Sequence, residues 1–327
     1  MVSGISDRLV LRTLDGAADL LMEELRPVGA VRQLSNVAVE CTVDGRLGEL
    51  AACPLYSTLA IPLPGEPGDR DFLRALERSS TSGVLATLRT PLTFRVGVEN
   101  PEVRRHLIKE VECTLGWINR PGGWTVNLTH TQQAWYAEIG PLSWTQRFGR
   151  SERLPWSTTP LVAEVLVRLA KIRPGQRVLD PFCGTGTIPR AVRRRHPTTR
   201  VLGSDHDPRA LELAIRNSRL DIDLVLANAN AEALPLPTDS IDRIVANLPF
   251  GKQVGTHQLN RTLYPKLLQE IDRVMAADGR AVLLTEDKRV LQQAIHHQPG
   301  LKLTRQRLLK YNGATPTAYV LTRPRRR

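Results

Sequence analysis

The sequence contains few cysteines, few aromatic residues and no long apolar segment. Its 327 residues include four cysteines, none in a CxxC spacing: Cys41, Cys53, Cys113 and Cys183. This argues against a disulfide framework and a cysteine-based metal site, so we expect reduced thiols, no metal and a cytoplasmic protein. No apolar run approaches the roughly 20 residues that span a bilayer, and the first seven residues do not resemble a signal peptide. We therefore expect no membrane association.

Acidic residues are missing from the C-terminal end of the chain. Residues 1–150 carry 16 Lys and Arg against 17 Asp and Glu, or −1, whereas residues 151–327 carry 29 against 16, or +13. The last 27 residues hold eight basic residues and no acid. A field of one sign attracts polyanions such as nucleic acid. Solubility and a general preference for arginine, 38 against 7 lysines, would explain the charge equally well.

Aromatic residues make up only 5% of the chain, yet its five tryptophans cluster in one stretch: Trp117, Trp124, Trp135, Trp144 and Trp156. Clustered indoles can stack on unpaired bases. Packing in a core or between domains is the more frequent reason for such residues, because their large apolar area is usually removed from water. We expect packing here.

Two small α+β modules are predicted in the first half of the chain. Residues 8–63 show a strand, helix, strand, helix, strand pattern, with Gly29 ending the first helix. A turn-rich linker between residues 62 and 68 separates the modules at about residue 65. The second module, residues 66–150, is expected to contain strands and one amphipathic helix, at 94–98, 103–118, 124–129 and 135–139.

From about residue 160 the pattern changes to alternating strands and helices, which is typical of a parallel, doubly wound sheet. Successive strands are expected at 177–180, 200–205, 224–227, 241–246 and 280–285. Two further strands, at about 301–311 and 315–322, are joined by Asn312-Gly313, a two-residue hairpin signal. The sheet should therefore end in an antiparallel pair, which a dinucleotide dehydrogenase sheet normally lacks.

The first of these strands ends in VLDPFCGTGTIPRA, residues 178–191. Ligands of such sheets bind beyond the carboxyl ends of the strands. Gly184 and Gly186 allow the backbone to approach a ligand closely, and the next helix directs its N-terminus there. Asp180 can pair with a ligand ammonium but would repel a pyrophosphate, and Pro189 replaces the third glycine of a dinucleotide fingerprint. A tight turn without a ligand is the less favoured alternative.

The second strand ends in GSDHDPRAL, residues 203–211. Asp205 lies where an acid accepts both hydroxyls of a ribose. Asp207 precedes a proline and is expected only to cap the next helix. Cys183 and His206 are expected to contribute by backbone and shape, because no base partner for a catalytic thiol is visible.

These motifs resemble those of class I S-adenosylmethionine-dependent methyltransferases, and more narrowly RNA guanine-N2 methyltransferases whose catalytic domain follows a THUMP RNA-binding region. The resemblance is carried by DPFCGTGT (180–187), SDHDP (204–208), NLPFG (247–251) and GTHQLNRTLY (255–264). It is specific over about residues 150–325 and rests on layout alone before them. It implies three parts: a ferredoxin-like α+β module (1–65), an abbreviated THUMP-like RNA-binding module (66–150), and an α/β Rossmann-like catalytic domain with an antiparallel C-terminal hairpin and basic tail (151–327).

The resemblance also implies S-adenosylmethionine as the methyl donor. The residues expected to bind it are Asp180, Phe182, Cys183, Gly184, Thr185, Gly186, Thr187, Asp205, His206, Asn230, Ala231 and Asn247. Relatives usually place an aspartate at the position of Asn230, where it receives the adenine amino group. An amide oxygen accepts that hydrogen bond more weakly, so we expect reduced cofactor affinity.

Asn247, Leu248, Pro249 and Phe250 are expected to form the catalytic site. The Asn247 amide oxygen and the Leu248 carbonyl can accept both N–H groups of an exocyclic amine, which directs the nitrogen lone pair toward the methyl group. Pro249 fixes the backbone and Phe250 stacks on the base. A paired guanine must leave its helix to reach such a site. A strand-end turn with a core phenylalanine is the alternative.

We therefore predict an RNA methyltransferase, acting as a monomer on N2 of a tRNA guanosine, with the acceptor stem favoured. The same strand-end device serves any exocyclic amine, so a ribosomal RNA guanine-N2 or DNA adenine-N6 methyltransferase stays open. An RNA-binding scaffold with a decayed cofactor site is an alternative of another class. Asn230 supports the scaffold, whereas Asp180 and Asp205 argue against it.

Overall fold

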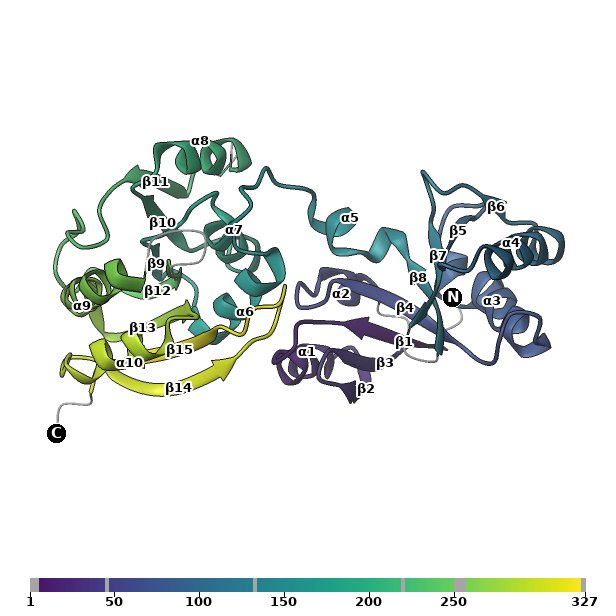
Figure 1. Ribbon diagram of the computed structural model, residues 1–327, viewed down its shortest axis with the longest axis horizontal. Helices are drawn as coiled ribbons and strands as arrows, with labels where there is room; N and C mark the ends of the chain where they lie inside the picture. Colours follow the sequence, from purple (N-terminus) through teal and green to yellow (C-terminus); the bar gives the residue numbers. More distant parts are fainter. Residues whose placement is uncertain (1–5, 45–46, 132–133, 219–220, 250–256, 325–327) are drawn as a thin grey trace. The chain divides into compact units, whose positions relative to one another are not determined.

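In a computed structural model the chain forms two compact units, residues 1–150 and 151–327 (Figure 1). The structure describes residues 6–44, 47–131, 134–218, 221–249 and 257–324. Across these ranges, every helix is too short or too polar to cross a lipid bilayer.

The described strands of the N-terminal unit form an eight-stranded sheet in the order β2-β3-β1-β4-β8-β7-β5-β6. They are β1 (Ser6–Arg12), β2 (Gly29–Ser35), β3 (Ala38–Asp44), β4 (Thr58–Leu63), β5 (Thr93–Gly97), β6 (Ile118–Asn119), β7 (Val126–Thr131) and β8 (Ala134–Ile139). The helices are α1 (Ala18–Leu25), α2 (Leu47–Ala52), α3 (Arg70–Ser82), α4 (Pro101–Leu115) and α5 (Trp144–Phe148). Because β4 pairs with β8, one sheet runs through both predicted modules, and their separation remains a prediction.

Strand β2 differs from the sequence prediction. Helix α1 ends at Leu25, and Gly29, expected to stop that helix, instead begins β2, which pairs antiparallel with β3. Most side chains of β2 are exposed, so the strand lacks the apolar alternation that marks a half-buried strand. The local pattern therefore could not reveal it.

The tryptophans divide between core and surface. Trp117 and Trp135 are buried and make edge-on contacts with Phe94 and Phe72, at ring-centroid distances of 6.2 and 5.8 Å. Packing is thus confirmed for these two residues. Trp156, near the start of the second unit, is 45% exposed and is not a core residue.

In the described part of residues 151–327, a seven-stranded sheet has the order β11-β10-β9-β12-β13-β15-β14. Its strands are β9 (Arg177–Asp180), β10 (Arg200–Asp205), β11 (Leu224–Asn228), β12 (Ile241–Asn247), β13 (Met275–Thr285), β14 (Lys302–Leu308) and β15 (Thr317–Thr322). Strands β9 to β13 run parallel, whereas β15 lies antiparallel between β13 and β14. This confirms the predicted α/β sheet with an antiparallel C-terminal pair.

Asn312 and Gly313 turn the chain between β14 and β15, as their sequence predicts. Both residues have positive φ angles, 50° and 73°. Tyr311 and Ala314 on either side exchange backbone hydrogen bonds of 3.1 and 2.8 Å. This is the geometry of a two-residue hairpin turn, which Asn-Gly adopts with little strain.

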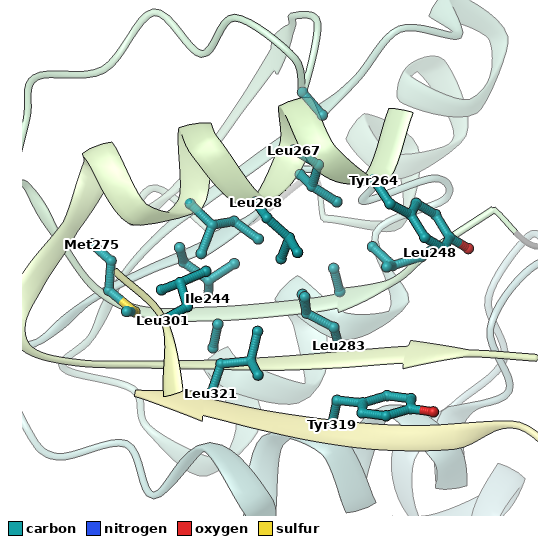
Figure 2. Packing of buried hydrophobic residues seen from close by; sticks show 14 of the residues in the cluster. Ile244, Leu248, Tyr264, Leu267, Leu268, Met275, Leu283, Leu301, Tyr319 and Leu321 are labelled. Atoms are coloured by element: carbon teal, nitrogen blue, oxygen red, sulfur yellow. The ribbon is translucent and has the colours of Figure 1, made fainter. Parts of the chain in front are cut away.

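Helices cover both faces of this sheet: α6 (Pro160–Ala170), α7 (Thr187–Arg195), α8 (Pro208–Asn217), α9 (His257–Val274) and α10 (Lys288–His296). Figure 2 shows Ile244, Leu283 and Leu321 of β12, β13 and β15 packed in one cluster with Leu267 and Leu268 of α9. Residues that alternate with them along the strands are also buried, so the opposite face is covered as well. Helix α6 contacts β12 and β13.

The strand order indicates where on the sheet a ligand would bind. Strand β9 has β10 on one side and β12 on the other, so the chain winds outward in both directions from β9. Ligands of open α/β sheets bind at such a switch point, beyond the carboxyl ends of the strands. The loops that follow β9, β10 and β12 therefore converge on one place.

Candidate functional site

A cavity of about 340 Å³ lies where β9, β10 and β12 end. This is within the usual size range of small-molecule sites. The segment before α6, the loop after β9, the start of α8 and the end of β12 supply its walls. The lining residues are Leu154, Trp156, Ser157, Thr158, Phe182, Cys183, Gly184, Thr185, Thr187, Asp205, His206, Asp207, Ala210, Asn247, Leu248 and Pro249.

The loop after β9 follows a path that requires its two glycines. Gly184 and Gly186 have φ angles of 51° and 81°, in the left-handed region. The Cys183 N–H donates to the Ser204 carbonyl (2.9 Å), which ties the loop to β10. A Cβ atom on Gly186 would lie 3.2 Å from the Cβ of Ala214 in α8. The loop is therefore rigid and close-packed, with its backbone exposed to the cavity at Gly184.

Asp180, at the end of β9, is a buried carboxylate that is only half satisfied. Its Oδ1 accepts a hydrogen bond from the Phe182 N–H (3.1 Å), whereas Oδ2 accepts none from any residue that the structure describes. Burial, and to a smaller extent the nearby carboxylate of Asp205, raise the pKa of Asp180 well above its ordinary value. A cationic group of a ligand would offset this cost.

Asp205, at the end of β10, is held by two backbone N–H groups. Its Oδ2 accepts from Gly184 (2.8 Å) and its Oδ1 from Asp207 (3.0 Å), so the carboxylate has one fixed orientation at the cavity wall. The ring of His206 is largely exposed, with its Nδ1 3.5 Å from Oδ1. Asp207 caps α8 through the Arg209 N–H (2.9 Å), as predicted, but it also lines the cavity.

Asn247, at the end of β12, presents an unused acceptor. Its Nδ2 donates to the Thr158 hydroxyl (3.0 Å), which fixes the plane of the amide. Its Oδ1 is buried and accepts no hydrogen bond from the described part of the chain. Leaving a buried amide oxygen unpaired costs about 1–3 kcal/mol. This arrangement suits a ligand that brings an N–H donor.

A chain of hydrogen bonds anchors the backbone just after Asn247. The Tyr264 hydroxyl lies 2.6 Å from the Pro249 carbonyl and 2.8 Å from the Thr285 hydroxyl. A carbonyl can only accept, so Tyr264 donates to Pro249 and must accept from Thr285. Thr285 in turn accepts from the Asp287 N–H (2.9 Å). Each hydrogen therefore points toward the site, and Figure 2 shows Tyr264 beside Leu248 at the edge of the cluster.

The structure brings most of the predicted site residues to one cavity. Its walls include the predicted cofactor residues Phe182, Cys183, Gly184, Thr185, Thr187, Asp205 and His206, together with Asn247, Leu248 and Pro249. Asp180 and Gly186 are buried in the same loop region without lining the cavity. Phe250 lies outside the described residues. The ligand roles of all these residues remain predictions.

Asn230 and Ala231 are in the turn after β11 and do not line the cavity. The Asn230 Oδ1 accepts from the Glu232 N–H (2.9 Å), and its carbonyl accepts from the Ala233 N–H (3.0 Å). The Asn230 side chain is exposed, whereas Ala231 is buried. Asn230 thus caps its own turn, and its contact with an adenine remains a prediction.

The segment before α6 was not predicted from the sequence to belong to the site. Leu154, Trp156, Ser157 and Thr158 all line the cavity. This segment does not follow a strand, so a search of strand ends does not reach it. The polar run Ser-Thr-Thr directly before the proline that begins α6 was the available signal.

The chain is similar in sequence to known methyltransferases. The profile of the RMKL-like, methyltransferase domain family matches residues 150–315. The chain is 37% identical over 185 residues to a tRNA (guanine(6)-N2)-methyltransferase of Thermus thermophilus, over 55% of this chain and 53% of that protein. It is 34% identical over 161 residues to the tRNA (guanine(6)-N(2))-methyltransferase THUMP3 of Homo sapiens, over 43% and 31%. The chain thus spans about half the length of the first relative and about a third of the second.

Solved structures match nearly the whole chain. TrmN from Thermus thermophilus has a TM-score of 0.76 at 28% identity, over 97% of this chain and 99% of that one. SMU.472, solved in complex with SAH, has a TM-score of 0.73 at 16% identity, over 99% and 100%. These matches confirm the predicted Rossmann-like methyltransferase fold, and the family profile confirms the resemblance carried by the strand-end motifs.

Tyr264→Phe should destabilise the protein, because it leaves the Pro249 carbonyl and the Thr285 hydroxyl without their shared partner. The expected loss is about 1–3 kcal/mol in the free energy of unfolding. Tyr319→Phe is the matched control, since it removes a hydroxyl from an equally buried ring of the same cluster without touching Pro249. Urea unfolding measures both variants. Equal losses in the two would contradict an anchoring role for Tyr264.

Proposed function

Because the chain belongs to the family of RMKL-like methyltransferase domains, we propose that it transfers a methyl group from S-adenosylmethionine to N2 of a guanosine in RNA. The names of its relatives favour tRNA as the substrate, and the motif resemblance favours the acceptor stem. One observation carries the proposal. Asn247, at the end of β12, lines the cavity with an amide oxygen that no described residue satisfies.

The cavity suits a cationic amino acid derivative of adenosine. S-adenosylmethionine supplies an electrophilic methyl group on a sulfonium. The unsatisfied oxygen of Asp180 fits its ammonium group, and the oriented carboxylate of Asp205 fits the ribose hydroxyls. Gly184 leaves room for the methionine portion along the loop, because a Cβ atom there would meet nothing within 4 Å. The carboxylate of Asp205 also favours positive charge in the cavity, and an ammonium group beside Asp180 would stabilise the charged form of that buried side chain.

Asn247 and Leu248 would position the accepting nitrogen. An exocyclic amine is a poor nucleophile, since its lone pair is delocalised into the ring. The Asn247 oxygen and the Leu248 carbonyl would each accept one N–H, which turns the lone pair toward the methyl carbon. Methyl transfer from the sulfonium leaves S-adenosylhomocysteine and a positive charge on the nitrogen, and the two acceptors would stabilise that charge until the proton is lost to water. The contribution of the protein is orientation and electrostatics.

The same acceptors would serve adenine N6 or a guanine in ribosomal RNA. These remain the rival substrates, and a binding scaffold without activity is the rival of another class. Incubation of the protein with radioactive S-adenosylmethionine and purified tRNA, ribosomal RNA or DNA separates them. Label in N2-methylguanosine from tRNA is the expected result. If only ribosomal RNA or only DNA is labelled, that nucleic acid is the substrate in place of tRNA. If none is labelled, the result favours the inactive scaffold.

Asn247→Ala should lower the single-turnover rate about 100- to 1,000-fold, the loss produced elsewhere by removing one preorganised polar group. The affinity for S-adenosylhomocysteine, measured by calorimetry, should stay within a few fold. Thr158→Val is the graded control, because it keeps the Asn247 oxygen and removes only the hydroxyl that orients the amide. Its loss should be clearly smaller. A near-normal rate in Asn247→Ala would overturn the assigned chemistry.

Asn230→Asp should tighten cofactor binding. The new carboxylate keeps one oxygen for the Glu232 N–H and presents a second acceptor in place of the amide nitrogen. Repulsion from Glu232 is limited by its ion pair with Lys266 (3.5 Å). A hydrogen bond to a charged group exceeds a neutral one by about 1 kcal/mol, so the expected gain is roughly five-fold.

Calorimetry should show this gain for both S-adenosylmethionine and S-adenosylhomocysteine, because the two share the adenine and differ at the sulfur. A gain for neither ligand would mean that Asn230 does not contact the adenine.

RNA binding should weaken steeply with salt, because residues 151–327 carry the +13 charge of the chain. Deleting Arg325, Arg326 and Arg327 should lower the slope of log K against log salt by up to about 0.9 for each phosphate that the tail neutralises. Cofactor affinity is the control and should not change. An unaltered slope would assign the tail to solubility alone.

A further inference from the structure

We propose that Trp156 is the stacking platform for the target base, on the wall of the cavity that carries Asn247. The inference rests on the proposed function and extends it to a base-binding residue. Trp156 is 45% exposed although it is the largest side chain of the cavity lining. The exposed face of a large indole on a cavity wall can make apolar contact with a planar ligand.

The backbone around Trp156 is ordered before any ligand arrives. The Leu154 N–H donates to the Ser157 hydroxyl (2.9 Å), and the Ser157 N–H donates to the Leu154 carbonyl (3.0 Å). The Arg153 guanidinium donates to the carbonyls of Ser157 and Thr158 (2.9 and 3.3 Å). Trp156 therefore sits within a closed turn, and little backbone entropy is lost when its ring meets a ligand.

Three attachments fix where this turn lies along the cavity. Glu152 is bound to Asn217 at the end of α8 by hydrogen bonds of 2.9 and 3.0 Å. The Ser157 hydroxyl lies 3.1 Å from the Thr185 hydroxyl in the glycine loop. Thr158 accepts from Asn247, at 3.0 Å. Ser157 and Thr158, the two residues directly after Trp156, therefore contact Thr185 in the loop after β9 and the side-chain amide of Asn247.

This position favours the accepting base over the cofactor adenine. A ribose on Asp205 directs the adenine toward β11, the outer neighbour of β10 in the sheet. Glu152 ties the start of the turn to α8, but Ser157 and Thr158, the two residues directly after Trp156, run toward the loop after β9 and the end of β12, where Asn247 would hold the target amine. A base removed from its helix loses its stacking neighbours, and an indole face replaces one of them. The ligand is therefore a purine presented by RNA.

Trp156→Ala should raise the KM for tRNA between about 5- and 150-fold, the range expected for losing one base-stacking ring. The dissociation constant for S-adenosylhomocysteine should stay within two-fold. Trp156→Phe should recover most of the loss, because the aromatic face returns. Ile215→Ala is the control, since it trims an exposed apolar side chain of α8 that does not line the cavity. Its effect on KM should stay within about two-fold.

A binding assay separates this inference from the proposed function. With saturating S-adenosylhomocysteine, a single-stranded RNA hexamer with one guanosine should quench the tryptophan emission of the wild-type protein. A hexamer that is abasic at that position brings the same phosphates and should quench much less. Trp156→Phe should abolish the difference between the hexamers. This readout needs no turnover, so it holds even if the wild type methylates no nucleic acid, the result that would sink the proposed function.

Two results would overturn the role of Trp156 while leaving the proposed function intact. An unchanged KM for Trp156→Ala, with equal quenching by the two hexamers, would make the residue a bystander. A selective loss of S-adenosylhomocysteine affinity in Trp156→Ala would assign the ring to the cofactor.

Discussion

The hydrogen bond from the Tyr264 hydroxyl to the Pro249 carbonyl joins the interior of the second unit to the cavity wall at the end of β12. The ring of Tyr264 is buried in the cluster that packs α9 on the sheet, so the hydroxyl cannot move independently of that core. Its remaining lone pair is engaged by Thr285, on the neighbouring strand β13. The Leu248 N–H meanwhile donates to the Leu284 carbonyl (2.9 Å). The short backbone segment after β12 is therefore held from two sides, which is the condition for placing an acceptor within tenths of an ångström.

The same rigidity explains how the protein tolerates polar atoms without partners. Asp180 and Asn247 each bury an oxygen that the described residues leave unpaired, and each lies at a strand end on the cavity side of the sheet. In a looser structure these groups would relax toward water or toward a neighbouring N–H. Here β9 and β12 are central strands, paired on both sides, so the cost remains stored in the free protein. Under the proposed function, ligand binding would recover this energy, and the ligand would be selected by its hydrogen-bond donors as well as by its shape.

The strand ends could be predicted because each is a short, largely buried run whose last residue is polar: Asp180, Asp205 and Asn247. Strand β2 could not, because its exposed side chains carry no alternating signal. The missed wall of the cavity, the segment before α6, has another cause. Thr158 meets Asn247 across 89 residues of sequence, and the partnership depends on how α6 packs on β12, which no local pattern encodes. Local burial reveals where a site lies, whereas its second wall follows from tertiary packing.

The raised pKa of Asp180 has a thermodynamic consequence for ligand capture under the proposed function. Burial makes the free protein hold the Asp180 proton at a pH where an ordinary aspartate would have lost it. An ammonium ion beside the same carboxylate reverses that preference, because it stabilises the charged form. Cofactor uptake would then be coupled to release of a proton, so its apparent affinity would rise with pH until Asp180 ionises unaided. The observed binding enthalpy would depend on which buffer receives the proton. At the half-satisfied carboxylate at the end of β9, the ammonium group of the ligand would enter as the proton leaves, so one positive charge would be exchanged for another.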